Sequence, residues 1–127
     1  MKIIIVEDEK SIRNGLVKML PKLDPEYEVV GSAKDGLEGY QQILAEQPDL
    51  VIMDIEMPEM DGHRLTKLVK SDDATKDIPI IIFSSLVNDE MKKKGEALGA
   101  DAQLSKPEIG NLVKIVDELV AERHLDR

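Results

Sequence analysis

The stretch that decides the fold is Lys2-Ile3-Ile4-Ile5-Val6, which runs directly into Glu7-Asp8. A short, uninterrupted run of Ile and Val favours a strand buried on both faces of a parallel sheet, although periodicity alone leaves a buried helix segment open. A second apolar run, Leu50-Val51-Ile52-Met53, also ends in an acid, Asp54. If both runs are strands of one parallel sheet, the three carboxylates are expected to meet at its C-terminal edge.

The other apolar runs also end in polar side chains. Ile80-Ile81-Ile82-Phe83 ends at Ser84, and a weaker run over 101–105 leads into Lys106. Ligands of open α/β sheets bind outside the carboxyl ends of the strands. We therefore expect Ser84 and Lys106 at the same edge as the three acids.

Amphipathic spacing between these runs predicts a helix after each strand. Pro21 and Pro25 are predicted to bound the first helix, and residues 27–31 alternate like a further strand. The fourth helix is predicted to stop near Gly99. Repeated alternation of strand and helix favours a parallel sheet with helices on both faces, because each crossover must be right-handed. The predicted fold class is α/β, a flavodoxin-like (βα)5 doubly wound parallel sheet with strand order 2-1-3-4-5. In that order the strands that carry Glu7 and Asp54 are neighbours.

Composition limits the partners of the chain. Its 127 residues have the usual size of one domain, and we expect residues 1–127 to form a single domain without an output domain. A net charge of -9 argues against direct binding to nucleic acid or to an anionic membrane surface. The absence of Cys excludes disulfides and thiolate metal sites. No apolar stretch reaches the roughly 20 residues of a membrane span, and no signal peptide is evident, so a cytoplasmic location is expected.

The three acids predict a cation site. Carboxylates packed together repel one another unless a positive charge enters, and a hard divalent cation takes oxygen ligands. Mg²⁺ is expected because it uses few carboxylates, keeps waters and accepts phosphate oxygens. We expect Asp8 and Asp54 as direct ligands, Glu7 acting through a water, and the backbone carbonyl of Glu56 as a further ligand. The competing interpretation of Glu7-Asp8 is a solvated acidic turn before the first helix.

Two more side chains suit the transfer of a phosphoryl group to Asp54. Lys106 supplies a point charge on a flexible stem, and Ser84 supplies a hydroxyl at the end of the next strand. A metal ion and Lys106 would neutralise the phosphoryl oxygens while Asp54 attacks in line. The expected product is an aspartyl phosphate.

At these residues the chain resembles the receiver domain of two-component response regulators. The matching motifs are Val6-Glu7-Asp8, Asp54-Ile55-Glu56-Met57-Pro58 followed by Asp61-Gly62, Ser84, and Gly99-Ala100-Asp101-Ala102 leading to Lys106-Pro107. The resemblance implies that Asp54 is the phosphoacceptor and that Glu7 and Asp8 are the metal-binding pair. It also implies that Ser84 is the switch hydroxyl and that Lys106 contacts the phosphoryl group.

The resemblance predicts a phosphorylation-dependent signalling switch that is not an enzyme and that receives its phosphoryl group from a sensor histidine kinase. The expected downstream partner is a protein that contacts helix four, strand five and helix five. Lys92-Lys93-Lys94 on the fourth predicted helix is either a solvated helix face or part of that surface. A monomer or a weak, phosphorylation-dependent dimer is expected.

The chain departs from the common receiver pattern at Gln103, where many receivers carry an aromatic residue that rotates inward on activation. Switching is therefore expected to depend more on the loop after strand four and on helix four. Residues up to about 62 resemble receivers of transcriptional regulators, and residues 80–120 resemble receivers attached to chemotaxis coupling proteins. This division is typical of a recombined or engineered chimera, and a natural stand-alone receiver is the alternative.

Other classes of protein stay open at this point. A flavin-binding electron carrier needs a hydroxyl- and glycine-rich phosphate cradle where this chain has Glu7-Asp8-Glu9. A phosphatase with an aspartyl nucleophile would use Asp54, but the chain is too short for a cap that closes over a substrate. An engineered scaffold would keep the fold and the metal site without a physiological output. His63 and His124 lack ligand spacing, and both are expected on the surface.

Overall fold

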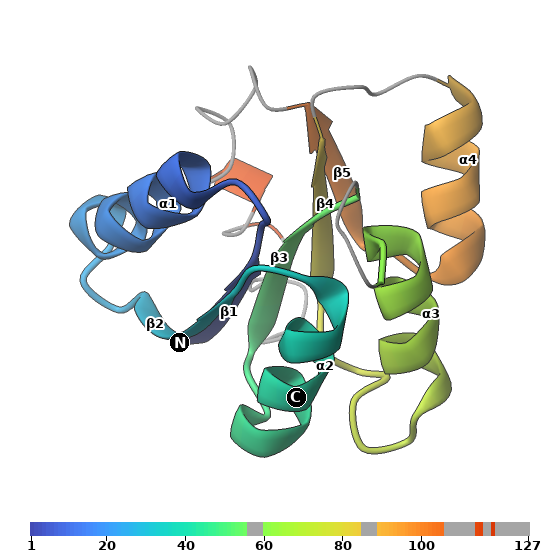
Figure 1. Ribbon diagram of the computed structural model, residues 1–127, viewed down its shortest axis with the longest axis horizontal. Helices are drawn as coiled ribbons and strands as arrows, with labels where there is room; N and C mark the ends of the chain where they lie inside the picture. Colours follow the sequence, from blue (N-terminus) through green and yellow to red (C-terminus); the bar gives the residue numbers. More distant parts are fainter. Residues whose placement is uncertain (56–59, 85–88, 106–113, 116–117, 119–127) are drawn as a thin grey trace.

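The computed structural model describes residues 1–55, 60–84, 89–105, 114, 115 and 118. A 5-stranded parallel sheet forms the centre of the molecule in the order β2-β1-β3-β4-β5, which confirms the predicted fold (Figure 1). The strands are β1 (Lys2–Val6), β2 (Glu28–Ala33), β3 (Leu50–Asp54), β4 (Ile80–Ser84) and β5 (Ala102–Ser105).

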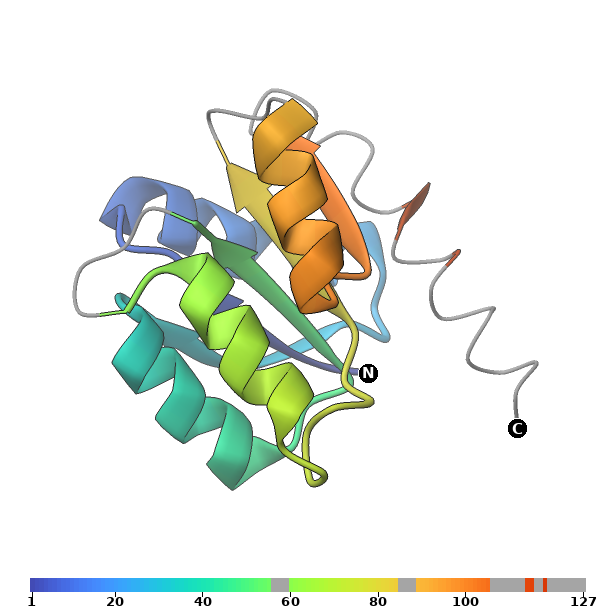
Figure 2. The same cartoon turned by 90° about the vertical axis from the view of Figure 1, so that its right-hand side faces the viewer.

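Helices cover both faces of the sheet. The helix α1 (Lys10–Leu23) lies on one face, and α2 (Gly36–Glu46), α3 (Gly62–Ser71) and α4 (Asp89–Leu98) lie in a row on the other (Figures 1 and 2). Of the last predicted helix, only residues 114, 115 and 118 are described, and each of them is helical. None of the helices in the described part of the chain has both the length and the apolar character that a membrane crossing requires.

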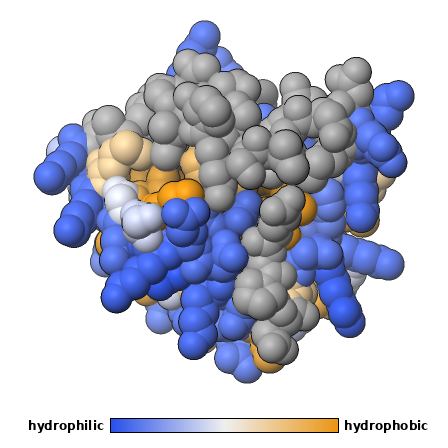
Figure 3. Space-filling view, turned by 45° about the horizontal axis from the view of Figure 1, so that its top comes forward, coloured by the Kyte–Doolittle hydropathy of each residue, from blue (hydrophilic) through white to orange (hydrophobic). Residues whose placement is uncertain are grey.

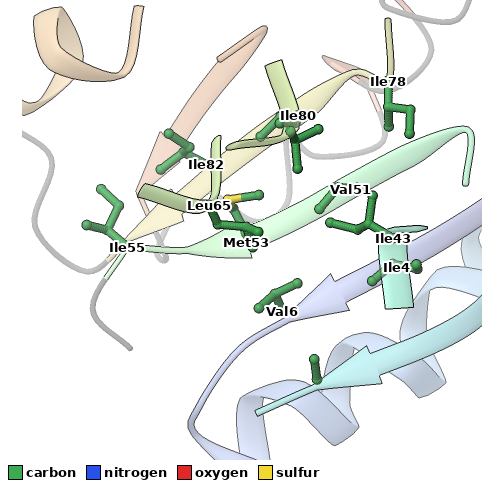
Figure 4. Packing of buried hydrophobic residues seen from close by; sticks show 12 residues of the cluster. Ile4, Val6, Ile43, Val51, Met53, Ile55, Leu65, Ile78, Ile80 and Ile82 are labelled. Atoms are coloured by element: carbon green, nitrogen blue, oxygen red, sulfur yellow. The ribbon is translucent and has the colours of Figure 1, made fainter. Parts of the chain in front are cut away.

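The three central strands β1, β3 and β4 are buried on both faces, as their unbroken apolar sequences predict, whereas the edge strand β2 is only partly buried. Side chains alternate along a strand, so Ile3 and Ile5 join one cluster while Ile4 and Val6 join the other. The cluster beneath α1 also contains Leu16, Leu20, Tyr27, Leu50, Ile52, Ile81 and Phe83. The cluster beneath α2 and α3 also contains Ala33, Ile43, Val51, Met53, Ile55, Leu65, Val69, Ile78, Ile80 and Ile82 (Figure 4). This packing fixes the strand ends in space.

Helix ends agree with the sequence in one case and differ in another. The prediction that Pro21 bounds the first helix is wrong, because α1 continues to Leu23 with Pro21 inside its last turn. Proline removes one backbone donor from the helix, but the helical turn around it is closed by the hydrogen bond from the Asp24 N–H to the carbonyl oxygen of Leu20 at 3.2 Å. The helix α4 ends at Leu98, as predicted, because Gly99 has a φ of 99° that favours glycine.

A partly buried lysine ties α3 to the start of β4 and β5. Lys70 Nζ donates to the carbonyl oxygen of Ile78 at 2.8 Å and to Asp101 Oδ2 at 3.0 Å. Asp101 Oδ2 also accepts from the backbone N–H of Ile80 at 2.8 Å. These bonds lie at the N-terminal ends of β4 and β5, away from the three acids, and they fix how the two strands pair.

Candidate functional site

Three acidic side chains meet beyond the C-terminal ends of β1 and β3. Val6 pairs with Met53 across these parallel strands, so the residues that follow leave the sheet side by side. Carboxylate oxygens of Glu7, Asp8 and Asp54 lie within 4.8 Å of one another. Glu7 and Asp54 are only 1% and 4% exposed, whereas Asp8 is exposed. The structure therefore brings together the three carboxylates that the sequence analysis grouped, with one of them open to solvent.

The N-termini of α2 and α3 lie at this edge of the sheet, and each has a polar capping residue. Asp35 caps α2 by accepting a hydrogen bond from the backbone N–H of Glu38 at 2.8 Å, and Asp61 caps α3 in the same way with Arg64 at 2.8 Å. Both helices therefore begin here with the positive ends of their dipoles. Figure 3 shows the face of the molecule that appears when the top of Figure 1 comes forward, and the described residues on this face are mostly hydrophilic, with smaller apolar areas.

The backbone orients the carboxylate of Asp54. The N–H of Ile55 donates to Asp54 Oδ1 at 2.8 Å, and the carbonyl oxygen of Ile55 accepts from the N–H of Gly62 at 2.8 Å. Gly62 lies so close to the end of β3 that a Cβ at this position would clash with the carbonyl oxygen of Asp54. The start of α3 is thus fixed directly against the residue that ends β3.

Arg13 is a site residue that the sequence analysis missed. Its guanidinium Nη1 donates to the carbonyl oxygen of Glu7 at 2.8 Å and to that of Asp8 at 3.4 Å. The first turn of α1 thereby holds the backbone of the two acids in place. A basic residue in the first turn of a helix is unfavourable for the helix dipole, and this local conflict is the signal in the sequence that could have drawn attention to Arg13.

The other expected site residues are placed in part or lie outside the described residues. Ser84 ends β4, whose preceding residue Phe83 pairs with Asp54, so the backbone of Ser84 reaches the same edge as the acids. The side chain of Ser84 is outside the described part of the structure. Glu56 and Lys106 also lie outside the described residues.

The grouped carboxylates fit a hard divalent cation. In an octahedral Mg²⁺ shell with oxygens at about 2.1 Å, neighbouring ligand oxygens are about 3.0 Å apart and opposite ones about 4.2 Å. The carboxylate oxygens of Glu7, Asp8 and Asp54 lie within 4.8 Å of one another, slightly wider than such a shell. A small rotation of the exposed Asp8 side chain would bring its oxygen to such a separation. A water between Glu7 and the ion would allow the Glu7 carboxylate to lie further away.

His63 is buried, so the expectation that it lies on the surface is wrong. Its exposed fraction is 5%, and its Nε2 has no hydrogen-bond partner among the described residues. Burial lowers the pKa of His63 below its ordinary value of 6.5, the nearby charge of Lys94 lowers it further, and Asp61 opposes both effects. The lack of ligand spacing in the sequence bears on metal binding and not on burial, which is why the expectation failed.

The lowered pKa of His63 predicts a loss of stability in mild acid. The unfolded chain takes up a proton on this histidine near pH 6.5, whereas the folded chain takes it up only at lower pH. The unfolded state therefore binds more protons in this window, and the free energy of unfolding falls as the pH drops from about 6.5 through the lowered pKa. Urea unfolding at about pH 7 and pH 5.5 should show a smaller loss for His63→Gln than for the wild type.

His124→Gln is the control for this pH prediction, because the chain has 2 histidines. The control variant should keep the stability loss of the wild type. An unchanged loss in His63→Gln would show that other groups cause the pH dependence.

Gln103 on β5 lies directly beneath α4. A Cβ at position 95 would lie 2.6 Å from Gln103 Oε1, so the absence of a side chain at Gly95 makes room for this amide. The side chain of Gln103 therefore faces helix α4. Gln103 occupies the position at which many receivers have an aromatic residue. The prediction that switching depends more on α4 and the loop before it stays a prediction.

A doubly wound sheet with clustered acids at its C-terminal edge defines the class of protein. Residues 3–117 match the response regulator receiver domain, so the chain belongs to this family. It is 38% identical over 109 residues to the protein-glutamate methylesterase/protein-glutamine glutaminase of Lawsonia intracellularis, a match that covers 86% of this chain and 27% of that protein. The chain spans about a third or less of the length of such relatives, with 29% of the Geobacter sulfurreducens protein as a second example.

Solved structures show the same relationship. A DNA-binding response regulator of the LuxR family from Staphylococcus aureus is 27% identical, with a TM-score of 0.84 over 92% of this chain and 96% of that chain. The response regulator domain of Thermotoga maritima CheB is 28% identical, with a TM-score of 0.76 over 96% of this chain and 92% of that chain. Both kinds of relative agree with the two resemblances that the halves of the sequence suggested.

Proposed function

We propose that the chain is a phosphorylation-dependent signalling switch whose phosphoacceptor is Asp54. The observation that carries this proposal is the position of Asp54, which ends β3 nearly buried beside the carboxylates of Glu7 and Asp8 in a chain of the receiver family. Carboxylates held together in this way cost stability unless the site binds a cation or reacts. A reactive acid in a cation site accounts for the whole arrangement.

The proposed reaction forms one bond and breaks one. A carboxylate oxygen of Asp54 attacks the phosphorus atom in line and forms an O–P bond, while the P–N bond to the phosphohistidine of a sensor kinase breaks. The leaving imidazole keeps the electron pair of the P–N bond and takes up a proton from solvent. The hydrogen bond from the Ile55 N–H at 2.8 Å supports this role, because it holds the carboxylate in one orientation.

We assign the metal ligands as Asp8 and Asp54 directly, Glu7 through a water, and the backbone carbonyl of Glu56. Bound Mg²⁺ would supply positive charge that neutralises the phosphoryl oxygens. The hydrogen bonds of Arg13 to the backbone of the two neighbouring acids support this assignment, since they hold both acids at the end of β1.

Ser84 and Lys106 are proposed to contact the phosphoryl group, Ser84 through its hydroxyl and Lys106 through its charge. The end of β4 at Ser84, next to the end of β3, supports the first of these roles. The family match over residues 3–117, which includes both positions, supports the second.

The proposed phosphoryl donor is a sensor histidine kinase, and the proposed downstream partner is a protein that contacts α4, β5 and the last helix. Phosphorylation would shift an equilibrium between inactive and active forms of that surface, only as far as the phosphoryl group interacts differently with the two. The net charge of -9 favours protein partners over nucleic acid. We propose a cytoplasmic switch that is monomeric or weakly dimeric and that turns over no substrate of its own.

The direct test is phosphorylation of the purified chain. Incubation with phosphoramidate, whose P–N bond resembles that of phosphohistidine, should add one phosphoryl group in the presence of Mg²⁺ and none after chelation. Intact mass spectrometry measures the addition, and hydroxylamine should remove it, because it cleaves acyl phosphates. A scaffold that keeps the fold without the chemistry would remain unlabelled, and steady hydrolysis of phosphomonoesters would favour the phosphatase class.

Mg²⁺ is expected to stabilise the folded chain. At a concentration of a hundred times its dissociation constant, the free energy of unfolding should rise by about 2.7 kcal/mol if the ion binds only the folded state. Asp8→Ala should abolish this gain and should stabilise the metal-free protein, because one of three mutually repelling carboxylates is removed. Urea unfolding with Mg²⁺ or with a chelator measures both effects.

The control for Mg²⁺ binding is Glu9→Ala. Glu9 is exposed, follows Asp8 in the sequence and lies outside the carboxylate cluster, so its removal changes the net charge equally. This variant should keep the Mg²⁺ gain of the wild type. Equal gains in both variants would contradict the assignment of Asp8 as a ligand.

A further inference from the structure

A cavity of about 510 Å³ lies between α3 and α4, apart from the carboxylate cluster. The two helices lie side by side on one face of the sheet in both ribbon views (Figures 1 and 2). This volume is within the range of about 300–1,000 Å³ that is typical of ligand pockets. We call this cavity the α3–α4 groove, and none of the residues assigned to the phosphorylation chemistry lines it.

The α3–α4 groove is basic on a protein that is acidic overall. Arg64 and Lys67 line it from α3, and Lys94 lines it from α4. These three side chains are exposed and make no ion pair with a described residue. The one acid in the wall, Asp61, already accepts a hydrogen bond as the cap of α3. Positive charge concentrated in this way, on a chain of net charge -9, favours an anionic ligand.

The wall also contains a buried polar atom of His63. His63 lines the groove at 5% exposure, and its Nε2 has no hydrogen-bond partner among the described residues. An unsatisfied buried nitrogen destabilises the fold, and a hydrogen bond to a ligand oxygen in the groove would offset this cost. In the tautomer with a proton on Nε2, the imidazole would donate a hydrogen bond to a carboxylate of the ligand.

The groove has a charged end and an apolar end. Lys94 acts electrostatically on His63 near the start of α3, so these residues and Arg64 form the charged end. Leu68 and Leu98 lie one turn further along α3 and α4. Both side chains are half-buried, and both line the groove. The lining from residue 61 to residue 71 corresponds to about 15 Å of helix, which about four or five extended residues would span.

We propose that the α3–α4 groove binds a short acidic segment of a partner protein, with its carboxylates at the charged end and an aliphatic side chain at the apolar end. Charge complementarity and the leucine-lined end together favour a peptide over a free inorganic anion, which would use only the charged end. Nucleic acid is disfavoured as a ligand, because the net negative charge of the chain would repel its phosphate groups. The proposal is independent of the phosphorylation chemistry. The groove shares α4 with the proposed surface of α4, β5 and the last helix, but it extends across to α3.

The test is a binding titration with the full chain. The probe is a fluorescein-labelled peptide of about five residues in which glutamates precede leucines, matched to the length of the groove. Fluorescence anisotropy should show saturable binding that weakens with salt. The same peptide with glutamine or lysine in place of glutamate should bind at least about tenfold more weakly. In NMR spectra the imidazole signals of His63 should shift when the acidic peptide binds.

Two double variants with equal net charge separate the groove from the general field of the protein. Arg64→Gln with Lys94→Gln removes two cations from the groove and should weaken binding about tenfold. Lys18→Gln with Lys93→Gln removes two exposed cations that do not line the groove and should change binding by less than about twofold. All four side chains are exposed, so both variants should retain the thermal unfolding temperature of the wild type.

Three results would overturn the proposal. The first is the absence of saturable binding of the acidic peptide. The second is equal binding by the two double variants. The third is complete competition by inorganic phosphate at the concentration of the peptide, which would show a site for small anions instead of a peptide groove.

Discussion

Asp54→Asn is expected to abolish the incorporation of phosphate from phosphoramidate in the presence of Mg²⁺. The amide keeps the size of the side chain but lacks the anionic oxygen that forms the O–P bond. Because Asp54 is 4% exposed and lies beside two other carboxylates, the loss of its charge should leave the metal-free fold at least as stable as the wild type. Loss of chemistry with stability retained is therefore the expected signature of a phosphoacceptor.

The matched control is Asp73→Asn. The side chain of Asp73 is 96% exposed, and among the described residues it makes a local ion pair with Lys76. This variant should be phosphorylated as completely as the wild type, and intact mass spectrometry of the three proteins makes the comparison. If Asp54→Asn still acquired a hydroxylamine-labile phosphate, another acid would be the acceptor and the assignment would fail.

Gly62→Ala is expected to destabilise the fold by about 3 kcal/mol, at the upper end of the usual cost of overpacking. The added methyl group would clash with the carbonyl oxygen of Asp54 and would lie 2.9 Å from the Cα of Ile55. Both neighbours are backbone atoms, so no side-chain rotation relieves the contact. The thermal unfolding temperature should fall by roughly 10 °C, and labelling of Asp54 should slow because the end of β3 must shift.

Gly15→Ala is the control for the same chemical change. Gly15 lies inside α1, and a Cβ there would meet no atom within 4 Å. Alanine is the better helix former, so this variant should be more stable than the wild type by about 0.5–1 kcal/mol. Opposite signs at the two positions are the expected result in urea unfolding. If Gly62→Ala left the free energy of unfolding unchanged, the backbone at the end of β3 would be able to shift at little cost. The close contact at Gly62 would then not constrain the fold.

Much of the candidate site was predictable because it depends on where strands end. The apolar runs before Glu7 and Asp54 identified buried strands, and parallel connectivity then placed both strand ends at one edge. The strand order 2-1-3-4-5 makes these two strands neighbours, and the register of their pairing places Val6 opposite Met53. Arg13 was not predictable in this way, since its partners are backbone carbonyls, which every sequence offers.

The pattern of residues along the chain was sufficient for the elements, their order and the clustering of three acids, because strand burial and helix amphipathicity are local properties with characteristic periods. Tertiary packing was needed for the burial of His63 and for the α3–α4 groove. The groove unites Arg64 with Lys94, residues on separate helices whose proximity depends on how both helices pack on the sheet. Contacts between elements arise from the shape of the packed core, and no local period in the sequence encodes them.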